Sequence, residues 1–208
     1  SFNRSLEFSL IIALPSAIAL IVMSNVIISA LFERGAFSSL DTLKTAAALT
    51  IYGIGLPAFI GQKIYQPIFY ARENTRSPFY FALIAMAVNL TLAVSLAQTF
   101  GYLASALGTT IASWTMLLLL KNSSKNYGPA TQIDSRNKRV IPRVVIASLI
   151  MGGLLLITNH LLSTTFFDVR NKYVVLLIMM FVGGFSYILI GQLIGAFSFK
   201  EIKSYFKK

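Results

Sequence analysis

The stretch Phe8–Phe32, FSLIIALPSAIALIVMSNVIISALF, decides the fold class of this chain, because its 25 consecutive residues include no charged side chain. A helix needs about 20 predominantly apolar residues to cross a hydrocarbon core of roughly 30 Å. A helix in a soluble core is usually shorter and carries a polar face. The stretch therefore predicts a helix that spans a membrane.

Stretches of the same kind fill most of the remaining chain. They are Leu43–Ala71, Phe79–Phe100, Tyr102–Leu120, Val144–Phe167 and Tyr173–Phe197. Charged residues make up only 12% of the sequence, whereas a typical globular domain has about 25%, which argues against a soluble enzyme. Continuous apolar runs such as Leu117–Leu120 also argue against the alternating strands of a membrane β-barrel. We therefore predict an all-α fold, a polytopic bundle of six transmembrane helices.

The distribution of Lys and Arg predicts the orientation of these spans, because positive residues concentrate in cytoplasmic loops. Thirteen of them lie on one side: Arg4, Arg72, Arg76, Lys121, Lys125, Arg136, Lys138, Arg139, Arg143, Lys200, Lys203, Lys207 and Lys208. The opposite side has four: Arg34, Lys44, Arg170 and Lys172. We therefore predict that both ends are cytoplasmic, with the loops around 33–43, 101 and 168–172 outside. The net charge of +11 is then an orientation signal and a contact for lipid headgroups, not a nucleic-acid footprint.

The joints between the spans predict two helical units. Residues 1–121 hold four spans, and residues 144–197 hold two. Between them, residues 122–143 are rich in basic residues and contain glycine and proline, which predicts a flexible cytoplasmic loop. The basic tail 198–208 is expected on the inner membrane surface, with a frayed terminus as the alternative. Because the chain begins with Ser1 and enters a span within a few residues, we expect it to be a piece of a longer protein.

Lys63 is the one basic residue deep inside a predicted span. A charge in hydrocarbon costs at least about 2.5 kcal/mol on insertion scales, so the ammonium should face a cavity or a partner. A cavity-facing lysine would suit a phosphate. The alternative is that its apolar stem lets the charge snorkel toward the interface near Arg72.

Proline residues mark candidate bends in the spans. Pro57 and Pro67 each remove a backbone donor from the span that contains Lys63, and broken helices commonly line the route in transporters. Pro15 is expected to bend the first span in the same way. The alternative for all three is a static kink within tight packing.

Other polar groups inside the spans carry weaker signals. Asn89 and Thr109 could help to coordinate an ion, but no carboxylate accompanies them within the membrane. Small residues recur every fourth position at Ala104, Gly108 and Ala112, which favours close helix packing. The acidic residues lie at or near span ends, so they form neither a catalytic pair nor a magnesium site. We assign no catalytic residue, no metal and no cofactor.

Two motifs in order then carry a resemblance to a known family. The first is Leu31–Phe37, LFERGAF, which follows the first span. The second is Phe69–Pro78, FYARENTRSP, which closes the span containing Lys63. Together they resemble the MurJ/MviN family of lipid II flippases, within the superfamily of multidrug and lipid-linked oligosaccharide exporters. The resemblance covers the whole chain.

This resemblance implies a fourteen-helix flippase fold, of which the chain would supply the last six spans. It implies a carrier, not an enzyme, that translocates undecaprenyl-linked peptidoglycan precursor across a bacterial inner membrane by alternating access. Lys63 stands where the family commonly has a lysine, and Lys63, Arg72 and Arg76 are the candidate substrate-binding residues. The implied partners are the membrane, lipid II and an N-terminal lobe. The alternatives are another exporter of the superfamily, or a truncated membrane protein that does not transport.

Overall fold

The computed structural model describes residues 2–128, 131–165 and 172–197. Its helices are α1 (Phe2–Phe32), α2 (Ser39–Tyr70), α3 (Arg76–Phe100), α4 (Leu103–Ser124), the short 3₁₀ helix η1 (Lys125–Tyr127), α5 (Asn137–Thr165) and α6 (Lys172–Leu193). Within these described ranges, six helices are long and apolar enough to cross a membrane. The prediction of an all-α fold with six spans is confirmed.

The helices extend beyond the predicted spans at several ends. The first helix begins at Phe2, six residues before the apolar stretch, and α5 begins at Asn137 with Pro142 inside it. Helices extend into both ends of the predicted loop 122–143, because α4 continues to Ser124 and residues 137–143 belong to α5. Hydropathy reports only the part of a helix inside hydrocarbon. The charged turns that project into the headgroup region are invisible to it.

The shortened connector between α4 and α5 is also tied to its surroundings, where the sequence predicted a flexible loop. The hydroxyl of Thr131 donates to the carbonyl oxygens of Ser124 (2.8 Å) and Gly128 (2.9 Å). The side chain of Asn3, in α1, donates to the carbonyl of Gln132 at 3.0 Å. These bonds close the connector on itself and attach it to the start of α1.

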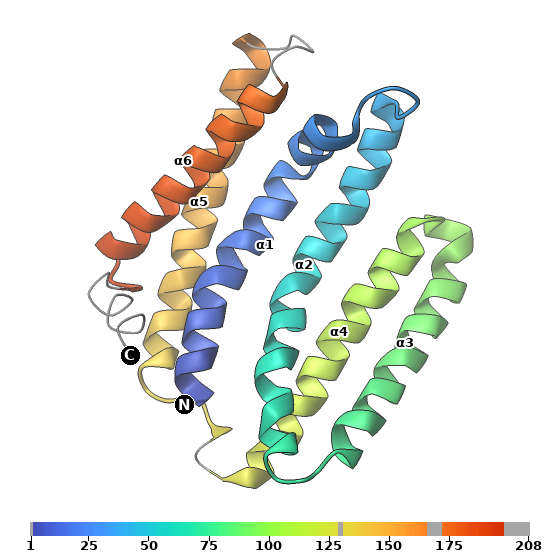
Figure 1. The fold of residues 1–208 in the computed structure, drawn as a ribbon, viewed down its shortest axis with the longest axis vertical. Coiled ribbons are helices and arrows are strands. Elements are labelled where there is room, and N and C mark those ends of the chain that lie inside the picture. The colour runs from blue at the N-terminus through green and yellow to red at the C-terminus, as the bar shows by residue number, and fades with distance from the viewer. Residues whose placement is uncertain (1, 129–130, 166–171, 198–208) are drawn as a thin grey trace.

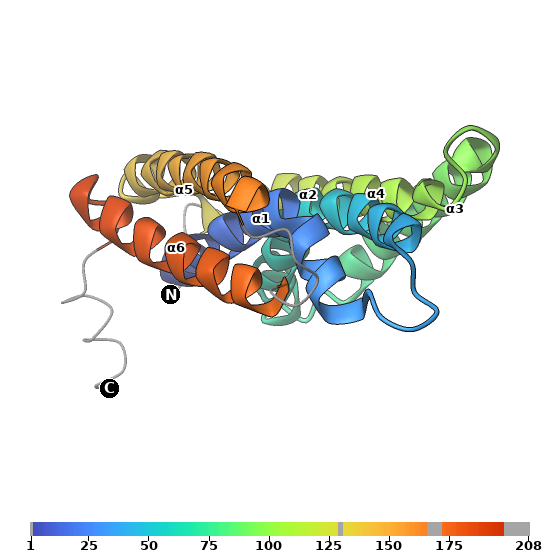
Figure 2. The ribbon, with the colours of Figure 1, turned by 90° about the horizontal axis from the view of Figure 1, so that it is seen from above.

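The six helices lie in an open row rather than a closed bundle. In Figure 1 the order across the row is α6 and α5, then α1, α2, α4 and finally α3. Figure 2 shows the same row from above as a flattened body. Side chains from α1, α5 and α6 form one apolar cluster, which includes Met23, Leu155 and Met179. A second cluster holds Phe69 of α2 against Leu120 of α4.

Among the described residues, the segments rich in Lys and Arg gather at the same ends of the helices, the lower ends in Figure 1. Figure 1 places the N-terminus, the turn between α2 and α3, and the connector between α4 and α5 at the same end, and the turns after α1 and α3 at the other. This arrangement agrees with the alternation in the sequence. Which end faces the cytoplasm stays a prediction, and the basic tail 198–208 lies outside the described residues.

Small residues allow the close approach that the spacing in α4 predicted. A Cβ atom on Gly108 would lie 2.7 Å from the side-chain oxygen of Asn89 and 2.9 Å from its backbone oxygen, both in α3. Ala104 and Ala112, one turn before and after, are buried. Small side chains let membrane helices pack backbone to backbone, and here they bring α3 onto α4.

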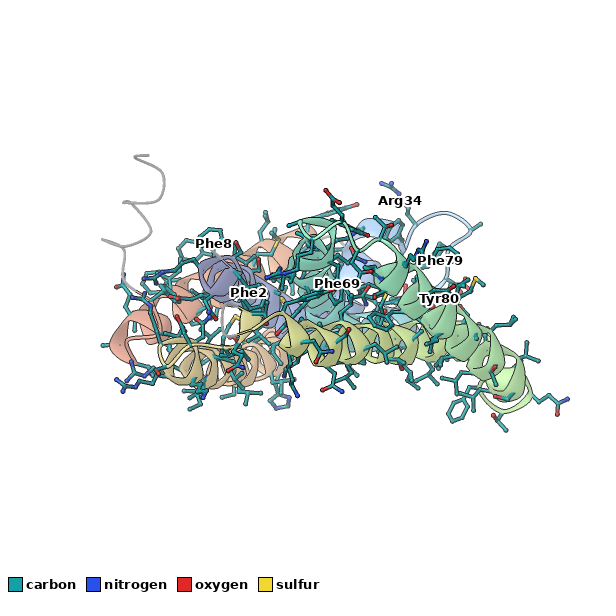
Figure 3. The ribbon with its side chains drawn as sticks, turned by 90° about the horizontal axis from the view of Figure 1, so that it is seen from below. Phe2, Phe8, Arg34, Phe69, Phe79 and Tyr80 are labelled. Atoms are coloured by element: carbon teal, nitrogen blue, oxygen red, sulfur yellow. The ribbon has the colours of Figure 1, made fainter. Side chains whose placement is uncertain are left out.

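Apolar side chains at the edge of the row point away from it. Phe79 and Tyr80, at the start of α3, are each 60% exposed. Figure 3 shows both near the outer helix, whereas Phe69 lies in the interior where α2 ends. A helix that is apolar on all sides suits contact with lipid. The exposed face of α3 is therefore compatible with a membrane environment.

Candidate functional site

Lys63 lies in the second half of α2, and its side chain is exposed. Its chain neighbours face α4: the Gln62 amide donates to the carbonyl of Ser113 at 2.8 Å, and a Cβ atom on Gly61 would lie 2.8 Å from Leu117. Lys63 therefore lies beside the α2–α4 contact and not in it. Within the described ranges, Lys63 makes no hydrogen bond or ion pair. Its substrate role and the snorkelling alternative both remain predictions.

Arg72, just past the end of α2, has structural partners. Its guanidinium donates to the carbonyl of Ile68 at 3.1 Å and to that of Tyr127 at 3.4 Å. The guanidinium carbon also lies 4.6 Å from the centre of the Tyr127 ring. A cation near the last carbonyls of a helix stabilises its end. Arg72 thus closes α2 and holds η1 in place.

The motif around Arg72 forms the turn into α3. The Asn74 side chain accepts from the backbone N–H of Ser77 at 3.0 Å and donates to the hydroxyl of Tyr127 at 2.6 Å. Asn74 thereby binds a free N–H in the first turn of α3 and joins the turn to η1. Arg76 begins α3 with an exposed side chain. Tyr127 holds this turn through its contacts with Arg72 and Asn74. Its role was not predicted, because it lies in the segment that was expected to be a flexible loop.

The three candidate substrate residues do not form one cluster through contacts. Lys63 and Arg72 are nine positions apart, which corresponds to about 13 Å along a helix. Arg72 and Arg76 lie at the basic ends of the helices, where α2 turns into α3. Lys63 lies deeper within the span. The candidate site is therefore divided in two, with the arginines at a helix end and Lys63 within the span.

The segment of α2 around Pro57 is supported by α4. Pro57 has no N–H, so the carbonyl one turn earlier lacks its helical partner. Two nearby carbonyls receive donors from α4: the Thr110 hydroxyl donates to Ile51 at 3.0 Å, and the Trp114 indole N–H donates to Ile54 at 3.2 Å. Neither is the Gly53 carbonyl that Pro57 leaves without its helical partner, so α4 stabilises this segment without replacing the lost bond. On the other side of Pro57, Gln62 also bonds to Ser113 of α4. Bending at Pro57 must therefore carry α4 along or break some of these bonds.

The other two candidate bends differ in their surroundings. Pro15 lies inside α1 with its side chain buried, whereas Pro67 lies inside α2 near its end and is exposed. Both helices continue through their prolines. A hinge role for Pro15, Pro57 and Pro67 stays a prediction.

The two weak ion-binding candidates sit at the α3–α4 contact. The oxygen atoms of Asn89 face Gly108, one residue before Thr109. The Thr109 hydroxyl donates to the carbonyl of Ser105 in its own helix at 2.8 Å. No group of three or more His, Cys, Asp or Glu residues that could hold a metal occurs in the described part of the chain. Asn89 packs against α4, and Thr109 bonds within its own helix. A role for the two residues in ion binding stays a prediction.

The LFERGAF motif forms the tight turn between α1 and α2. Gly35 has a φ angle of +61°, a left-handed conformation that glycine adopts without steric cost. The N–H of Phe37 donates to the carbonyl of Arg34 at 3.2 Å, which closes the turn. Figure 3 shows Arg34 projecting from this end. The Ser38 side chain then caps α2 through a reciprocal pair of bonds with Asp41.

Two acidic residues that the sequence analysis left without a role are paired. Glu7 binds Arg136 and Arg4, and Glu33 binds Lys172. Their partners are distant in sequence, apart from Arg4, so local patterns could not reveal them. Their position at the ends of one apolar span was the only available signal.

Comparisons with known proteins agree with the motifs. A family model described as lipid II flippase MurJ matches residues 1–180. A probable lipid II flippase MurJ from Rhizobium meliloti (strain 1021) is 43% identical over 156 residues, which make up 74% of this chain and 28% of that protein. A probable lipid II flippase MurJ from Buchnera aphidicola subsp. Acyrthosiphon pisum is 31% identical over 195 residues, or 91% of this chain and 37% of the relative.

A solved structure is similar as well. The lipid II flippase MurJ in an inward closed conformation has a TM-score of 0.75 and 30% sequence identity, covering 92% of this chain and 38% of that one. The chain therefore spans between about a quarter and two fifths of the length of these proteins. Its assignment to the last six spans stays a prediction. Because the family model covers most of the sequence, this multi-pass membrane chain belongs to the MurJ family of lipid II flippases, which are transporters and not enzymes.

Proposed function

We propose that this chain is the C-terminal part of a flippase that moves lipid II, the undecaprenyl-linked peptidoglycan precursor, across a bacterial inner membrane by alternating access. The observation that supports this most strongly is the family match over residues 1–180. The similarity of the six-helix arrangement to a solved flippase supports it independently. No covalent chemistry is required, because the substrate changes sides without changing bonds.

The open row supports the need for further helices. A lysine exposed on an apolar helix is costly in lipid, so the face of α2 that carries Lys63 should be covered by the rest of the transporter. An N-terminal lobe in that position would enclose Lys63 in a wet cavity. There the ammonium would attract the pyrophosphate of lipid II as a point charge. Arg72 and Arg76, at the basic ends of the helices, would contact the headgroup of lipid II before it reaches Lys63.

Complementation tests this proposal. A bacterium depleted of its flippase receives residues 1–208 alone, the N-terminal lobe of a relative alone, or both together. We expect growth only with both, because neither part encloses a cavity by itself. Immunoblots of membrane fractions control for expression and insertion.

Two results would contradict the proposal. Growth with residues 1–208 alone would show that the N-terminal lobe is dispensable. Failure of the pair, when both parts insert and copurify, would favour the truncated protein that does not transport.

A further inference from the structure

The helix α1 is bracketed by two carboxylates that both bind cations from the α5–α6 part of the chain. Glu7 lies in its second turn, and Glu33 follows its last residue. The 26 positions between them correspond to about 39 Å of helix, close to the roughly 40–45 Å of a bilayer with its headgroup regions. The two ion pairs thus lie near opposite faces of the membrane, where water can still solvate them.

The pair at Glu7 is bidentate and embedded in a network. The Arg136 Nη2 atom lies 3.0 Å from one Glu7 oxygen, and its Nε atom lies 3.1 Å from the other. Arg4 binds the same carboxylate at 3.2 Å. The next residue, Asn137, is fully buried and donates to the backbone oxygen of Asn3 at 2.8 Å. Bidentate arginine pairs add geometric specificity to their strength.

The carboxylate of Glu33 is held by a lysine and by hydroxyl groups, with no arginine fork. The Lys172 ammonium, at the first residue of α6, lies 2.8 Å from one Glu33 oxygen. The Thr42 hydroxyl of α2 donates to the other oxygen at 2.9 Å. Lysine is a point charge on a flexible stem, without the planar fork of arginine. The Glu33 side chain is also more exposed than that of Glu7, at 21% against 10%.

Between the two pairs the interface is apolar, apart from one polar bond among the described residues. The Tyr187 hydroxyl of α6 donates to the carbonyl of Ile11 in α1 at 2.6 Å. The buried members of the apolar cluster shared by α1, α5 and α6 lie in α5, in α6 and at Ala196 and Phe197 just after it, apart from Met23, which belongs to α1. Ile11 lies nearer to Glu7 than to Glu33. The half of the interface near Glu33 therefore depends on apolar contact and on the Lys172 pair.

We propose that Glu7 and Glu33 differ in how they hold the α5–α6 pair: Glu7, bound by the fork of Arg136 beside the buried Asn137 bond, anchors the start of α5 to α1, and Glu33, bound by one flexible lysine, is a releasable latch at the other end. When the latch opens, α6 pivots away from α1 about the anchored end. In Figure 1 and Figure 2 the start of α6 lies beside the end of α1, which is where this opening would occur. The proposal concerns internal motion and does not depend on the transported substrate.

Distances between spin labels test this directly in the full chain reconstituted into lipid nanodiscs. One pair, at Leu31 and Tyr173, reports the Glu33 end; a second, at Ser5 and Lys138, reports the Glu7 end. All four positions are exposed. We expect Glu33→Gln to widen the first distance distribution and shift it to longer values, with the second unchanged. Glu73→Gln, at an exposed acid in the α2–α3 turn, is the matched control and should change neither.

Charge exchange and the anchor variant complete the test. The double variant Glu33→Lys with Lys172→Glu should restore the narrow distribution, which loss of packing alone would not allow. Arg136→Lys keeps the charge at the anchor but removes the fork, and should widen the Ser5–Lys138 distribution. An unchanged Leu31–Tyr173 distribution in Glu33→Gln would overturn the latch. Equal widening at both ends in Glu33→Gln would overturn the pivot.

Discussion

Two interfaces on either side of the α1–α2 core are held together by different chemistry. The α4 helix joins α2 through neutral donors to backbone carbonyls, such as Thr110 to Ile51. The α5–α6 pair joins α1 through ion pairs at the helix ends, at Glu7 and Glu33. Charged pairs are expensive to bury and need nearby water, whereas neutral groups can bond within hydrocarbon. The depth of each contact therefore decides which polar chemistry it uses.

The largest expected effect is in a labelling experiment that assigns the Glu7 pair and the Glu33 pair to opposite faces of the membrane. The chain has no cysteine, so single cysteines at Ser39 and Asn126, both exposed, give clean reporters for the two ends. In intact spheroplasts an impermeant maleimide should label the Ser39 position only, because Lys and Arg concentrate at the other end. Lysis before labelling controls for reactivity. Labelling at Asn126 alone would invert the orientation of both interfaces.

The next effect tests the face of α2 that neither interface covers. In a reconstituted full-length flippase, Lys63→Met should lower lipid II translocation, while Lys63→Arg keeps part of it. A hydrogen bond to a charged group contributes about 1.5–3 kcal/mol, which is roughly tenfold or more in rate. Methionine preserves the apolar stem, so packing is controlled. Translocation by Lys63→Met at the parental rate would assign Lys63 to snorkelling.

The close approach of α3 to α4, which the small residue Gly108 allows, should contribute strongly to stability. Gly108→Leu places a side chain against the backbone of Asn89, which cannot move aside without separating α3 from α4. Overpacking typically costs about 1–3 kcal/mol. Gly153→Leu is the matched control, because nothing lies within 4 Å of a Cβ atom at Gly153. Thermal unfolding in detergent should show a lower midpoint for the first variant only; equal losses would argue against the α3–α4 contact.

Removing one neutral donor should cost less. Thr110→Val deletes the bond to Ile51 while keeping the side-chain shape, and such bonds average about 0.6 kcal/mol in membranes. Thr115→Val is the control, because that hydroxyl donates to Ile111 within α4. The free energy of unfolding, from titration with a denaturing detergent, should fall more for Thr110→Val. A larger loss for Thr115→Val would show that the α2–α4 bond adds nothing.

At ordinary pH the smallest effect is the pH dependence of the latch, because its transition lies in strong acid. The hydrogen bonds from Lys172, Ser29 and Thr42 lower the pKa of Glu33 to about 2, from an ordinary value of 4.5. A carboxyl with a lowered pKa stabilises the folded state fully above its unfolded pKa, and this stabilisation is lost as the pH falls toward the folded value. The Leu31–Tyr173 distance should therefore widen between pH 4.5 and 2. Glu33→Gln should show no such transition, and a widening of equal size in that variant would assign it to other groups.

Sequence patterns predicted the scaffold of the candidate site better than its contacts. The six spans, the single lysine deep in a span and the prolines beside it could all be identified from local composition. The partners of Arg72 could not be, because Tyr127 lies 55 residues away along the chain. The predicted loop 122–143 hid both η1 and the anchoring residue Arg136, since charged helical turns outside hydrocarbon have the composition of loops.

The sequence by itself determined that the chain crosses a membrane six times and that its basic residues gather at one end. Both properties follow from the free energy of placing apolar and charged groups in hydrocarbon, which depends on local composition. Only the tertiary structure decided that Glu7 meets Arg136 and that Glu33 meets Lys172, across 129 and 139 residues. Such pairings depend on how each helix is rotated and tilted against its neighbours. That is set by the packing of small and large side chains along whole helix faces, which no local stretch of sequence contains.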